Sequence, residues 1–250
     1  MEKITSRKNK IVSHFRSLGR DRAYREECGE YICDGSKLLE EAIKWSAEIT
    51  AVLCASGTKP VLPENARTYE LPQELMDYVS PLQNSQGVLF SVKMCDKSAK
   101  SHSCAIVLEG IQDPGNLGTI VRTANALSLD CVILADGCAD LYNPKTIRAT
   151  MGAIFRQSII KIPTSDLRER LRAWDLRLYG AALTENATNI RKTSLKNSAV
   201  AIGSEGSGLS DQMLSLCDGQ IIIPMNPECE SLNAAAAAAI VMWELSGQGA

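Results

Sequence analysis

Residues 221–240 are IIIPMNPECESLNAAAAAAI, in which an apolar run, a polar loop and six consecutive alanines follow one another. Alanine has the highest intrinsic helix propensity, so Ser231-Leu232-Asn233 are expected to open a helix that continues through the alanines. Ser231 is a suitable N-cap, because its hydroxyl can accept a backbone N–H of the first turn. Residues 220–223 have the length and composition of a short buried strand. The stretch therefore predicts a strand, a loop and a helix in close succession.

Apolar runs of strand length alternate with segments of helical spacing throughout residues 104–250. Parallel strands need crossover connections, which are usually helices, and such a sheet is covered on both faces. The sequence therefore predicts an α/β domain with a mostly parallel sheet over residues 104–250. The predicted strands are residues 104–108, 131–134, 159–162, 178–183, 199–203 and 220–223, and predicted helices include 144–153, 165–174 and 210–216.

Residues 1–95 predict a smaller α/β domain of their own. Helical spacing at 11–18, with Gly19 as a stop, and at 36–45 predicts two helices, and β-like runs occupy 49–54 and 87–92. Residues 94–103 are polar and show no apolar periodicity, so a linker is expected there.

Three loops at the carboxyl ends of predicted strands, residues 109–116, 203–210 and 224–233, are rich in Gly, Pro, Asn, Ser and Glu. Ligands of parallel sheets bind beyond these ends, so one composite site is expected. A dinucleotide-binding GxGxxG pattern fails, because Asp211 stands where a third glycine is needed. The phosphate-binding GxxxxGK[ST] loop is also absent.

Three motifs lie in these loops: Asn116, Gly118, Arg122 and Ala124 in an NxGxxxRxA pattern, GSEGSGL at residues 203–209, and Ile223-Pro224-Met225 ahead of Ser231-Leu232-Asn233. In this order they resemble the motifs of the SpoU/TrmH-like RNA 2′-O-ribose methyltransferases of the SPOUT superfamily. The resemblance covers most of the chain. It implies a deep trefoil knot in the C-terminal domain, S-adenosylmethionine as cofactor, and methylation of a ribose 2′-hydroxyl in structured RNA without a metal.

The resemblance also implies residue roles. It assigns cofactor contacts to Gly203, Ile223 and Leu232, and apolar walls with backbone donors and acceptors suit an adenine ring. Arg122 takes the place of the catalytic arginine, expected to contact the target phosphate and help to activate the ribose hydroxyl. A guanidinium rarely gives up its proton, so orientation and charge stabilisation are favoured over general-base action.

The remaining members of the motifs have two interpretations each. By the resemblance, Asn116, Glu205, Ser231 and Asn233 are candidate catalytic residues near the reacting centre, with Asn233 positioning RNA or catalytic loops. From the residues alone, Glu205 is at least as well explained as a loop-holding carboxylate that accepts backbone N–H groups. Ser231 could serve only as a helix cap.

Basic residues are concentrated at the N-terminus, although the net charge of the chain is −2. Residues 1–25 carry eight basic and two acidic side chains, and such a cluster can bind nucleic acid. A solvated amphipathic helix explains the charges equally well. The resemblance assigns residues 1–95 to a ribosomal-protein-like RNA substrate-binding domain, which makes Arg7, Lys8 and Lys10 the candidate RNA contacts.

The nine cysteines form no CxxC pair, and there are only two histidines. This favours reduced structural thiols in a cytoplasmic protein over a disulfide framework or a zinc site, and Cys229 is expected to be a buried, inert thiol. The longest apolar stretch, residues 234–243, is too short to cross a bilayer, so no membrane association is expected. The resemblance implies a homodimer formed through the C-terminal domain.

Alternatives to the leading interpretation remain open. Ribosomal RNA is favoured over transfer RNA as the substrate only by analogy with the extra N-terminal domain. A non-catalytic RNA-binding or ribosome-assembly factor could keep the same fold. A nucleotide-dependent α/β enzyme with another cofactor is disfavoured by the broken GxGxxG pattern.

Overall fold

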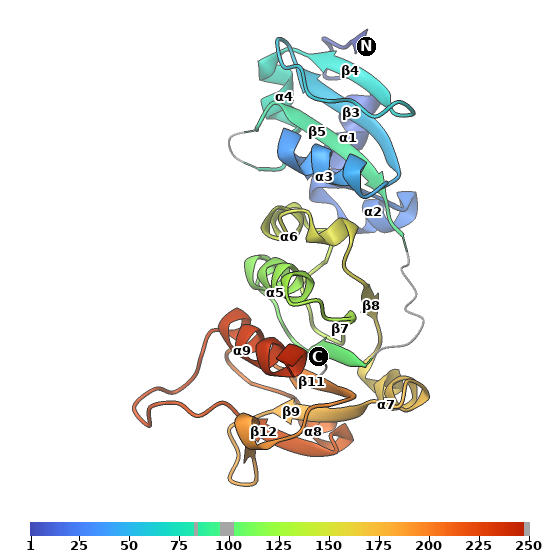
Figure 1. Ribbon diagram of the computed structural model, residues 1–250. Helices are drawn as coiled ribbons and strands as arrows, with labels where there is room; N and C mark the ends of the chain where they lie inside the picture. Colours follow the sequence, from blue (N-terminus) through green and yellow to red (C-terminus); the bar gives the residue numbers. More distant parts are fainter. Residues whose placement is uncertain (83–84, 96–102, 248–250) are drawn as a thin grey trace. The chain divides into compact units, whose positions relative to one another are not determined.

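The computed structural model describes residues 1–82, 85–95 and 103–247, which form two compact units (Figure 1). The first unit combines Met1–Cys95 with Asp140–Phe155, and the second combines Asp96–Ala139 with Arg156–Ala250. Most of the predicted linker, residues 96–102, lies outside the described residues.

The first unit is built on a five-stranded mixed sheet in the order β1-β4-β3-β5-β2. β1, β4 and β3 run parallel, while β5 is antiparallel to both β3 and β2. The strands are β1 (Glu2–Lys3), β2 (Glu30–Asp34), β3 (Ile49–Ala55), β4 (Arg67–Leu71) and β5 (Val88–Lys93). The helices are α1 (Lys10–Arg20), α2 (Arg22–Cys28), α3 (Ser36–Lys44), α4 (Gln73–Val79) and α6 (Pro144–Ala149), with a 3₁₀ turn at Ala153–Phe155.

One face of this sheet is covered by α1 and α4. Phe15 of α1 and Met76 of α4 are fully buried against Leu53 of β3 in a single apolar core. On β2, Ile32 belongs to this core, so its neighbour Tyr31 points to the opposite face. There the ring of Tyr31 packs on that of Tyr142, with 4.7 Å between centroids. The segment Asp140–Phe155 therefore completes the second face of the N-terminal sheet.

The predicted elements of residues 1–95 are present, but five others were not predicted. The predicted helix at 11–18 extends through Gly19 to Arg20, so Gly19 is not its stop. The missed elements are β1, α2, β2, β4 and α4. In α2 only Arg25 is buried, and in β4 only Leu71 is, so neither segment shows a clear apolar period.

A buried ion pair attaches the segment Asp140–Phe155 to α2. The Arg25 guanidinium donates to the Asp140 carboxylate at 2.6 Å and to the Leu18 carbonyl at 2.7 Å. The two side chains are only 5% and 11% exposed. The predicted division into domains at 1–95 and 104–250 stays a prediction, and the structure adds that this segment packs within the first unit.

Asp140→Ala is expected to lower the free energy of unfolding by about 3–5 kcal/mol, because it leaves the buried Arg25 charge without a carboxylate counter-ion. Equilibrium unfolding in urea measures the change. The matched control is Glu26→Ala, which breaks the exposed Arg22–Glu26 pair at 2.9 Å and should cost less than about 1 kcal/mol. Equal losses for the two variants would contradict a special contribution from the buried pair.

The predicted helix at 144–153 is too long. α6 ends at Ala149, because Met151 and Gly152 have left-handed backbone conformations, with φ of 49° and 88°. A Cβ added at Gly152 would lie 3.0 Å from the Glu41 side chain, so both the conformation and the close packing favour glycine there.

The second unit is built on a seven-stranded sheet in the order β10-β12-β9-β11-β6-β7-β8, in which all the paired strands are parallel. This confirms the predicted α/β class and its parallel sheet. The strands are β6 (Cys104–Leu108), β7 (Cys131–Leu134), β8 (Ile159–Lys161), β9 (Arg177–Ala181), β10 (Thr188–Asn189), β11 (Ser198–Ile202) and β12 (Gly219–Ile222). Only the two-residue β10 was not predicted.

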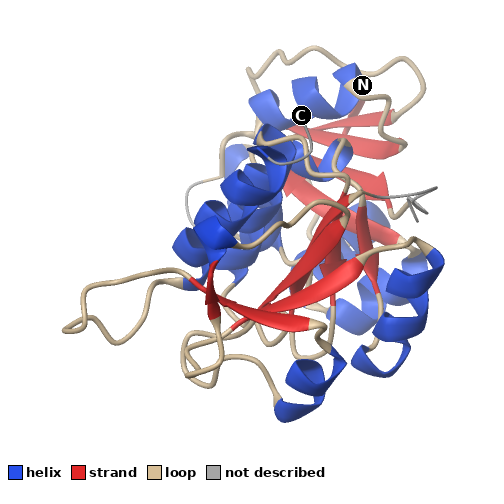
Figure 2. Cartoon of the chain, turned by 60° about the horizontal axis from the view of Figure 1, so that its bottom comes forward, coloured by secondary structure: helices blue, strands red, loops and turns tan. Residues whose placement is uncertain are grey.

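Helices lie on both sides of this sheet (Figure 2). Leu167 of α7 and Met213 of α8 pack in one core with strand residues such as Ala105. On the other side, α5 and α9 pack against each other, α5 also packs against β7, and α9 against β6 and β11. The helices are α5 (Pro114–Ala126), α7 (Thr164–Ala173), α8 (Asp211–Leu216) and α9 (Ala234–Gly247), with a 3₁₀ turn at Ile190–Lys192.

The nine cysteines are free thiols in this structure. Burial raises the pKa of the Cys131 thiol to about 12 and that of Cys104 to about 11, so both stay protonated and unreactive near neutral pH. Within the described residues, no helix has both the length and the apolar character needed to cross a membrane.

Candidate active site

Two of the motif loops begin side by side at the carboxyl edge of the parallel sheet. β11 pairs with β6 so that Ile202 lies opposite Leu108, and the next residue, Glu109, donates its N–H to the Ile202 carbonyl at 3.0 Å. Gly203 follows Ile202 directly, so the first and second loops leave the sheet as neighbours. The expected shared edge is therefore present for these loops.

The second loop is closed on itself immediately after Gly203. Ser204 and Gly208 exchange two backbone hydrogen bonds, at 3.0 and 3.1 Å. A Cβ added at Gly203 would lie 2.1 Å from the backbone carbon and oxygen of Gly208. No side chain fits at this distance, so glycine is required at the position where the resemblance places a cofactor contact.

Glu205 joins all three motifs. Its Oε1 accepts hydrogen bonds from Asn116 Nδ2 at 2.9 Å, from Asn233 Nδ2 at 2.5 Å and from the Ala234 backbone N–H at 3.1 Å. Asn233 Nδ2 also lies 3.2 Å from Asn116 Oδ1. These three side chains, the amide–carboxylate cluster, connect α5, the second loop and the start of α9. The geometry is that of a carboxylate that holds loops together.

The prediction that Ser231 caps the last helix is wrong. α9 begins at Ala234, and the Asn233 Oδ1 accepts the N–H groups of Ala235 and Ala236, at 3.0 and 3.2 Å. Asn233 can do so because Glu205 fixes its amide nitrogen. Ser231 lies two residues earlier in an exposed loop, and within the described residues its side chain forms no hydrogen bond with the cluster.

Sequence reasoning missed Glu109, which ties the first loop to the second. Its two carboxylate oxygens accept the backbone N–H and the hydroxyl of Ser210, both at 2.8 Å. Ser210 in turn caps α8 by accepting the Met213 N–H at 3.0 Å. The only sequence signal was a serine ahead of a helix, and no spacing rule links it to a carboxylate 101 residues away.

Arg122 lies on the exposed side of α5. Leu117, Ile120 and Val121 of the same helix are fully buried. Among the residues that the structure describes, none forms a hydrogen bond or ion pair with the guanidinium. Arg122 is therefore free to bind an anionic group, but it is not part of the amide–carboxylate cluster.

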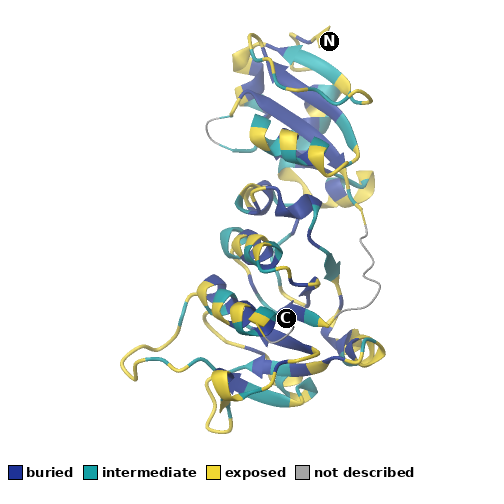
Figure 3. Cartoon of the chain, viewed as in Figure 1, coloured by how far each residue is buried: buried dark blue, intermediate teal, exposed yellow. Residues whose placement is uncertain are grey.

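The third loop, between β12 and α9, is largely exposed (Figure 3). Ile223 and Leu232, at its two ends, are half-buried and leave apolar surface accessible. The resemblance assigns these two residues to the cofactor, and accessible apolar surface suits an adenine ring. The prediction of a buried thiol at Cys229 is wrong, because Cys229 is exposed, and its Sγ lies 3.4 Å from the Ser231 carbonyl oxygen.

The predicted RNA contacts of the first unit differ in their surroundings. Arg7 forms an ion pair with Glu74 at 2.7 Å, and its guanidinium lies 4.7 Å from the centre of the Tyr78 ring. Lys8 and Lys10 are exposed, and neither forms an ion pair within the described ranges. In residues 1–82, 85–95 and 103–247, no group of three or more His, Cys, Asp or Glu side chains is arranged to hold a metal ion.

The fold and the site define an α/β protein with one composite ligand site, formed by loops at the carboxyl edge of a parallel sheet. Residues 103–243 match the model of the SpoU rRNA Methylase family, and residues 9–89 match that of the MRM3-like substrate binding domain. The chain belongs to the SpoU rRNA methylase family. This confirms the family predicted from the three motifs, and with it the predicted class of enzyme, an RNA ribose 2′-O-methyltransferase.

Relatives match over almost the whole chain. The chain is 30% identical to the 23S rRNA (guanosine(2553)-2′-O)-methyltransferase RlmP of Bacillus subtilis, over 99% of this chain and 100% of the relative. A putative TrmH-family RNA methyltransferase structure from Porphyromonas gingivalis is 27% identical, covers 94% of this chain and 96% of its own, and superposes with a TM-score of 0.83. An AdoMet-bound rRNA methyltransferase from Sinorhizobium meliloti shares the fold, at 24% identity, coverage of 98% and 97%, and a TM-score of 0.86.

Proposed function

We propose that the chain transfers a methyl group from S-adenosylmethionine to a ribose 2′-hydroxyl of ribosomal RNA. The observation that carries this proposal is the amide–carboxylate cluster, in which Glu205 joins Asn116 and Asn233 and so holds all three family motifs together. The name of the Bacillus subtilis relative supports ribosomal RNA over transfer RNA. We also propose that the protein acts in the cytoplasm, which a ribosomal substrate supports.

The residues of the site divide into three tasks. Gly203, Ile223 and Leu232 hold the cofactor, which supplies an electrophilic methyl group on a sulfonium centre. Arg122 binds the target phosphate and stabilises charge that develops on the ribose oxygen. Asn116, Glu205 and Asn233 hold the three motif loops together. Ser231 lies close to the reacting centre.

We also propose that the C-terminal unit contains the trefoil knot of the family. β12 is separated from β11 by β9, yet α9, which follows β12, packs against β11, β6 and α5. The chain must therefore pass back over the sheet between β12 and α9. The Glu205 side chain of the second loop holds the start of α9, which supports a crossing of the two loops at this point. Residues 104–250 would then form the methyl-transfer domain and residues 1–95 the RNA-binding domain.

Mapping of 2′-O-methyl groups in RNA from cells with and without the protein tests the function. One ribosomal position should lose its methyl group when the protein is absent and regain it on incubation with the purified full chain and S-adenosylmethionine. Loss of a methyl group from a transfer RNA instead would favour the alternative substrate. Unchanged methylation, together with no cofactor binding in calorimetry, would favour an RNA-binding assembly factor.

The basic N-terminal residues are expected to bind RNA through its phosphates. Replacing Arg7, Lys8 and Lys10 with alanine should weaken RNA binding and flatten its salt dependence by up to about one unit of slope per lost phosphate contact. Lys8 and Lys10 should account for most of the change, because Arg7 already pairs with Glu74. Cofactor affinity should not change.

The control for this measurement is Lys44→Ala/Lys59→Ala, which removes exposed charges elsewhere in the same unit. RNA affinity at several salt concentrations gives the slopes of both variants. If the triple variant keeps the wild-type slope, the N-terminal segment is only a solvated helix.

We propose a homodimer formed through α9. Ala236, Ile240 and Trp243 form an exposed stripe along this helix, and Trp243 is 67% exposed. Trp243→Glu should place a charge in the interface and give a monomer in sedimentation at micromolar concentration. Leu183→Glu, at another exposed apolar residue of the same unit, should stay dimeric. A fully active wild-type monomer would refute the proposal.

A further inference from the structure

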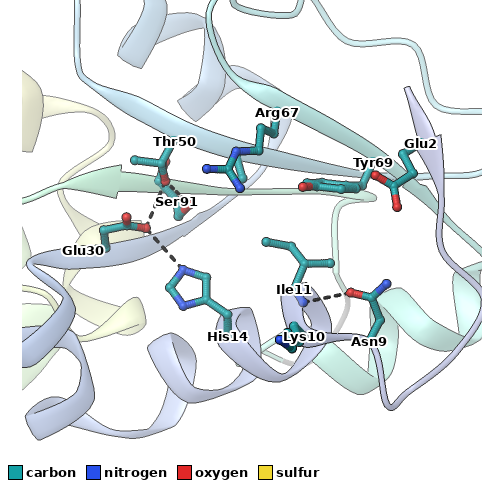
Figure 4. A pocket seen from close by; sticks show the side chains of 11 residues that line it. Glu2, Asn9, Lys10, Ile11, His14, Glu30, Thr50, Arg67, Tyr69 and Ser91 are labelled. Carbon is teal, nitrogen blue, oxygen red and sulfur yellow. Dashed lines mark hydrogen bonds and ion pairs between the residues drawn. The ribbon is translucent and has the colours of Figure 1, made fainter.

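A polar pocket of about 410 Å³ lies in the first unit, between α1 and the sheet (Figure 4). Its volume is in the range of sites that hold a small molecule or a single extruded group. Apart from Lys10, no residue assigned above to catalysis, cofactor or RNA takes part in it. The pocket is lined by Glu2, Asn9, Lys10, Ile11, His14, Glu30, Thr50, Ala51, Arg67, Tyr69 and Ser91.

The strand register places the wall residues on one face of the sheet. Arg67 and Tyr69 are two residues apart on β4, so their side chains point the same way. Glu2 lies opposite Tyr69 in the parallel pairing of β1 with β4, and Ala51 lies opposite Arg67. This is the face that packs under α1. At this end of the layer, polar residues replace the apolar core and leave a hollow.

The floor of the pocket is a connected polar network. The Thr50 hydroxyl donates to Glu30 Oε2 at 2.9 Å and lies 2.5 Å from the Ser91 hydroxyl. The same Glu30 oxygen lies 3.3 Å from His14 Nε2, and His14 Nδ1 lies 2.9 Å from the Tyr24 hydroxyl. His14 and Glu30 are only 24% and 17% exposed. The network holds Glu30 and His14 in fixed positions at the base of the hollow.

A β-bulge in the pairing of β3 with β5 points the Thr50 side chain toward this network. The pairing of β3 with β5 shifts register between Ile49 and Ala51, so Thr50 is an extra residue in the ladder. β-Bulges re-aim side chains and are frequent next to functional sites. Here the bulge is what allows the Thr50 hydroxyl to reach Glu30 and Ser91.

The rim combines cations with an aromatic ring. Lys10 and Arg67 are exposed, and neither pairs with a carboxylate in the part of the chain that the structure describes. Tyr69 is half-buried and, with Ile11, offers apolar surface to the hollow (Figure 4). The Glu2 carboxylate stands beside Tyr69 across the strand pair. An occupant thus meets a ring face, two positive charges and one acceptor at the ring's edge.

We propose that this pocket binds one unstacked nucleotide of the RNA substrate, an inference that rests on the proposed function. Proteins read single-stranded RNA by stacking its splayed bases on aromatic side chains and by contacting base edges. In this pocket the base stacks on Tyr69, the Glu2 carboxylate accepts from N–H groups at the base edge, and Lys10 and Arg67 bind the flanking phosphates. Lys8 lies two residues before Lys10, so the RNA path proposed for the N-terminal segment leads into the pocket.

The test measures how the full chain binds a fluorescein-labelled RNA of about ten unpaired nucleotides that contains all four bases. Tyr69→Leu should weaken binding by about five- to a hundredfold, because stacking is lost. Tyr69→Phe should bind as the wild type does. Arg67→Ala should weaken binding and reduce the salt slope by about one unit, whereas Tyr69→Leu should leave the slope unchanged. The control Lys44→Ala should keep the affinity within about a factor of two.

Wild-type affinity in Tyr69→Leu and in Arg67→Ala would overturn the pocket proposal. If Tyr69→Leu melts at a lower temperature, its loss of binding could come from unfolding. Arg67 is exposed, so Arg67→Ala should keep the fold, and its RNA affinity then decides the test. Methyl transfer by the wild-type protein is measured in parallel. A wild-type chain that methylates no RNA refutes the proposed function, whereas active variants with unchanged RNA affinity refute only the pocket.

Discussion

Replacing Arg122 with alanine is expected to lower the rate of methyl transfer by about a hundred- to a thousandfold, while S-adenosylmethionine still binds within a few-fold of the wild-type affinity. The guanidinium is exposed on α5, and among the described residues it has no partner that its removal would leave unsatisfied. Its loss should therefore weaken the binding of the RNA phosphate and the stabilisation of charge on the reacting ribose oxygen. The stability of the fold should not change. Single-turnover rates and calorimetry measure the two quantities.

Arg122→Lys separates charge from geometry. A lysine keeps the positive charge but cannot form the two parallel hydrogen bonds of a guanidinium, so this variant should also be slow. Arg172→Ala, at an exposed arginine of α7, is the control and should transfer methyl groups at the wild-type rate. Near-normal turnover in either Arg122 variant would remove this residue from the mechanism.

The parallel sheet of the second unit could be predicted because strands buried on both faces are uninterrupted apolar runs. β6 (CAIVL) and β7 (CVIL) are of this kind, and their predicted ends agree with the structure. In the first unit, β4 (RTYEL) is mostly half-exposed and has one fully buried residue, so its composition resembles that of a loop. Only elements with several buried residues carry an apolar pattern that can be recognised in the sequence.

The same limit applies to the site. Asn116, Glu205 and Asn233 could be expected to meet because their loops leave the same sheet edge, although Asn116 is 89 residues from Glu205 and 117 from Asn233. The bond from Ser210 to Glu109 could not be foreseen, because it depends on the register that sets Ile202 opposite Leu108. Hydrogen-bond partners distant in sequence follow from register, which hydrophobic patterning does not specify.

Gly203→Ala is expected to abolish S-adenosylmethionine binding, with a loss of affinity of at least about a hundredfold, and to lower the melting temperature. The added Cβ would lie 2.1 Å from the carbon and oxygen of Gly208 and 2.4 Å from the Leu209 nitrogen. These are backbone atoms, so no side-chain rotation relieves the clash. The turn closed by Ser204 and Gly208 must open, and opening it moves Glu205 away from Asn116 and Asn233.

Gly206→Ala is the matched control, because it makes the same chemical change three residues later in the same turn. A Cβ at Gly206 meets no atom within 4 Å, and the residue does not have a left-handed backbone. This variant should bind the cofactor within a few-fold of the wild type and melt at a similar temperature. If both variants lose cofactor binding, an added methyl group anywhere in this loop prevents binding. The loss in Gly203→Ala could then not be attributed to the clash with Gly208. If Gly203→Ala binds normally, the closed turn is not the cofactor cradle, and the assignment of Gly203 fails with it.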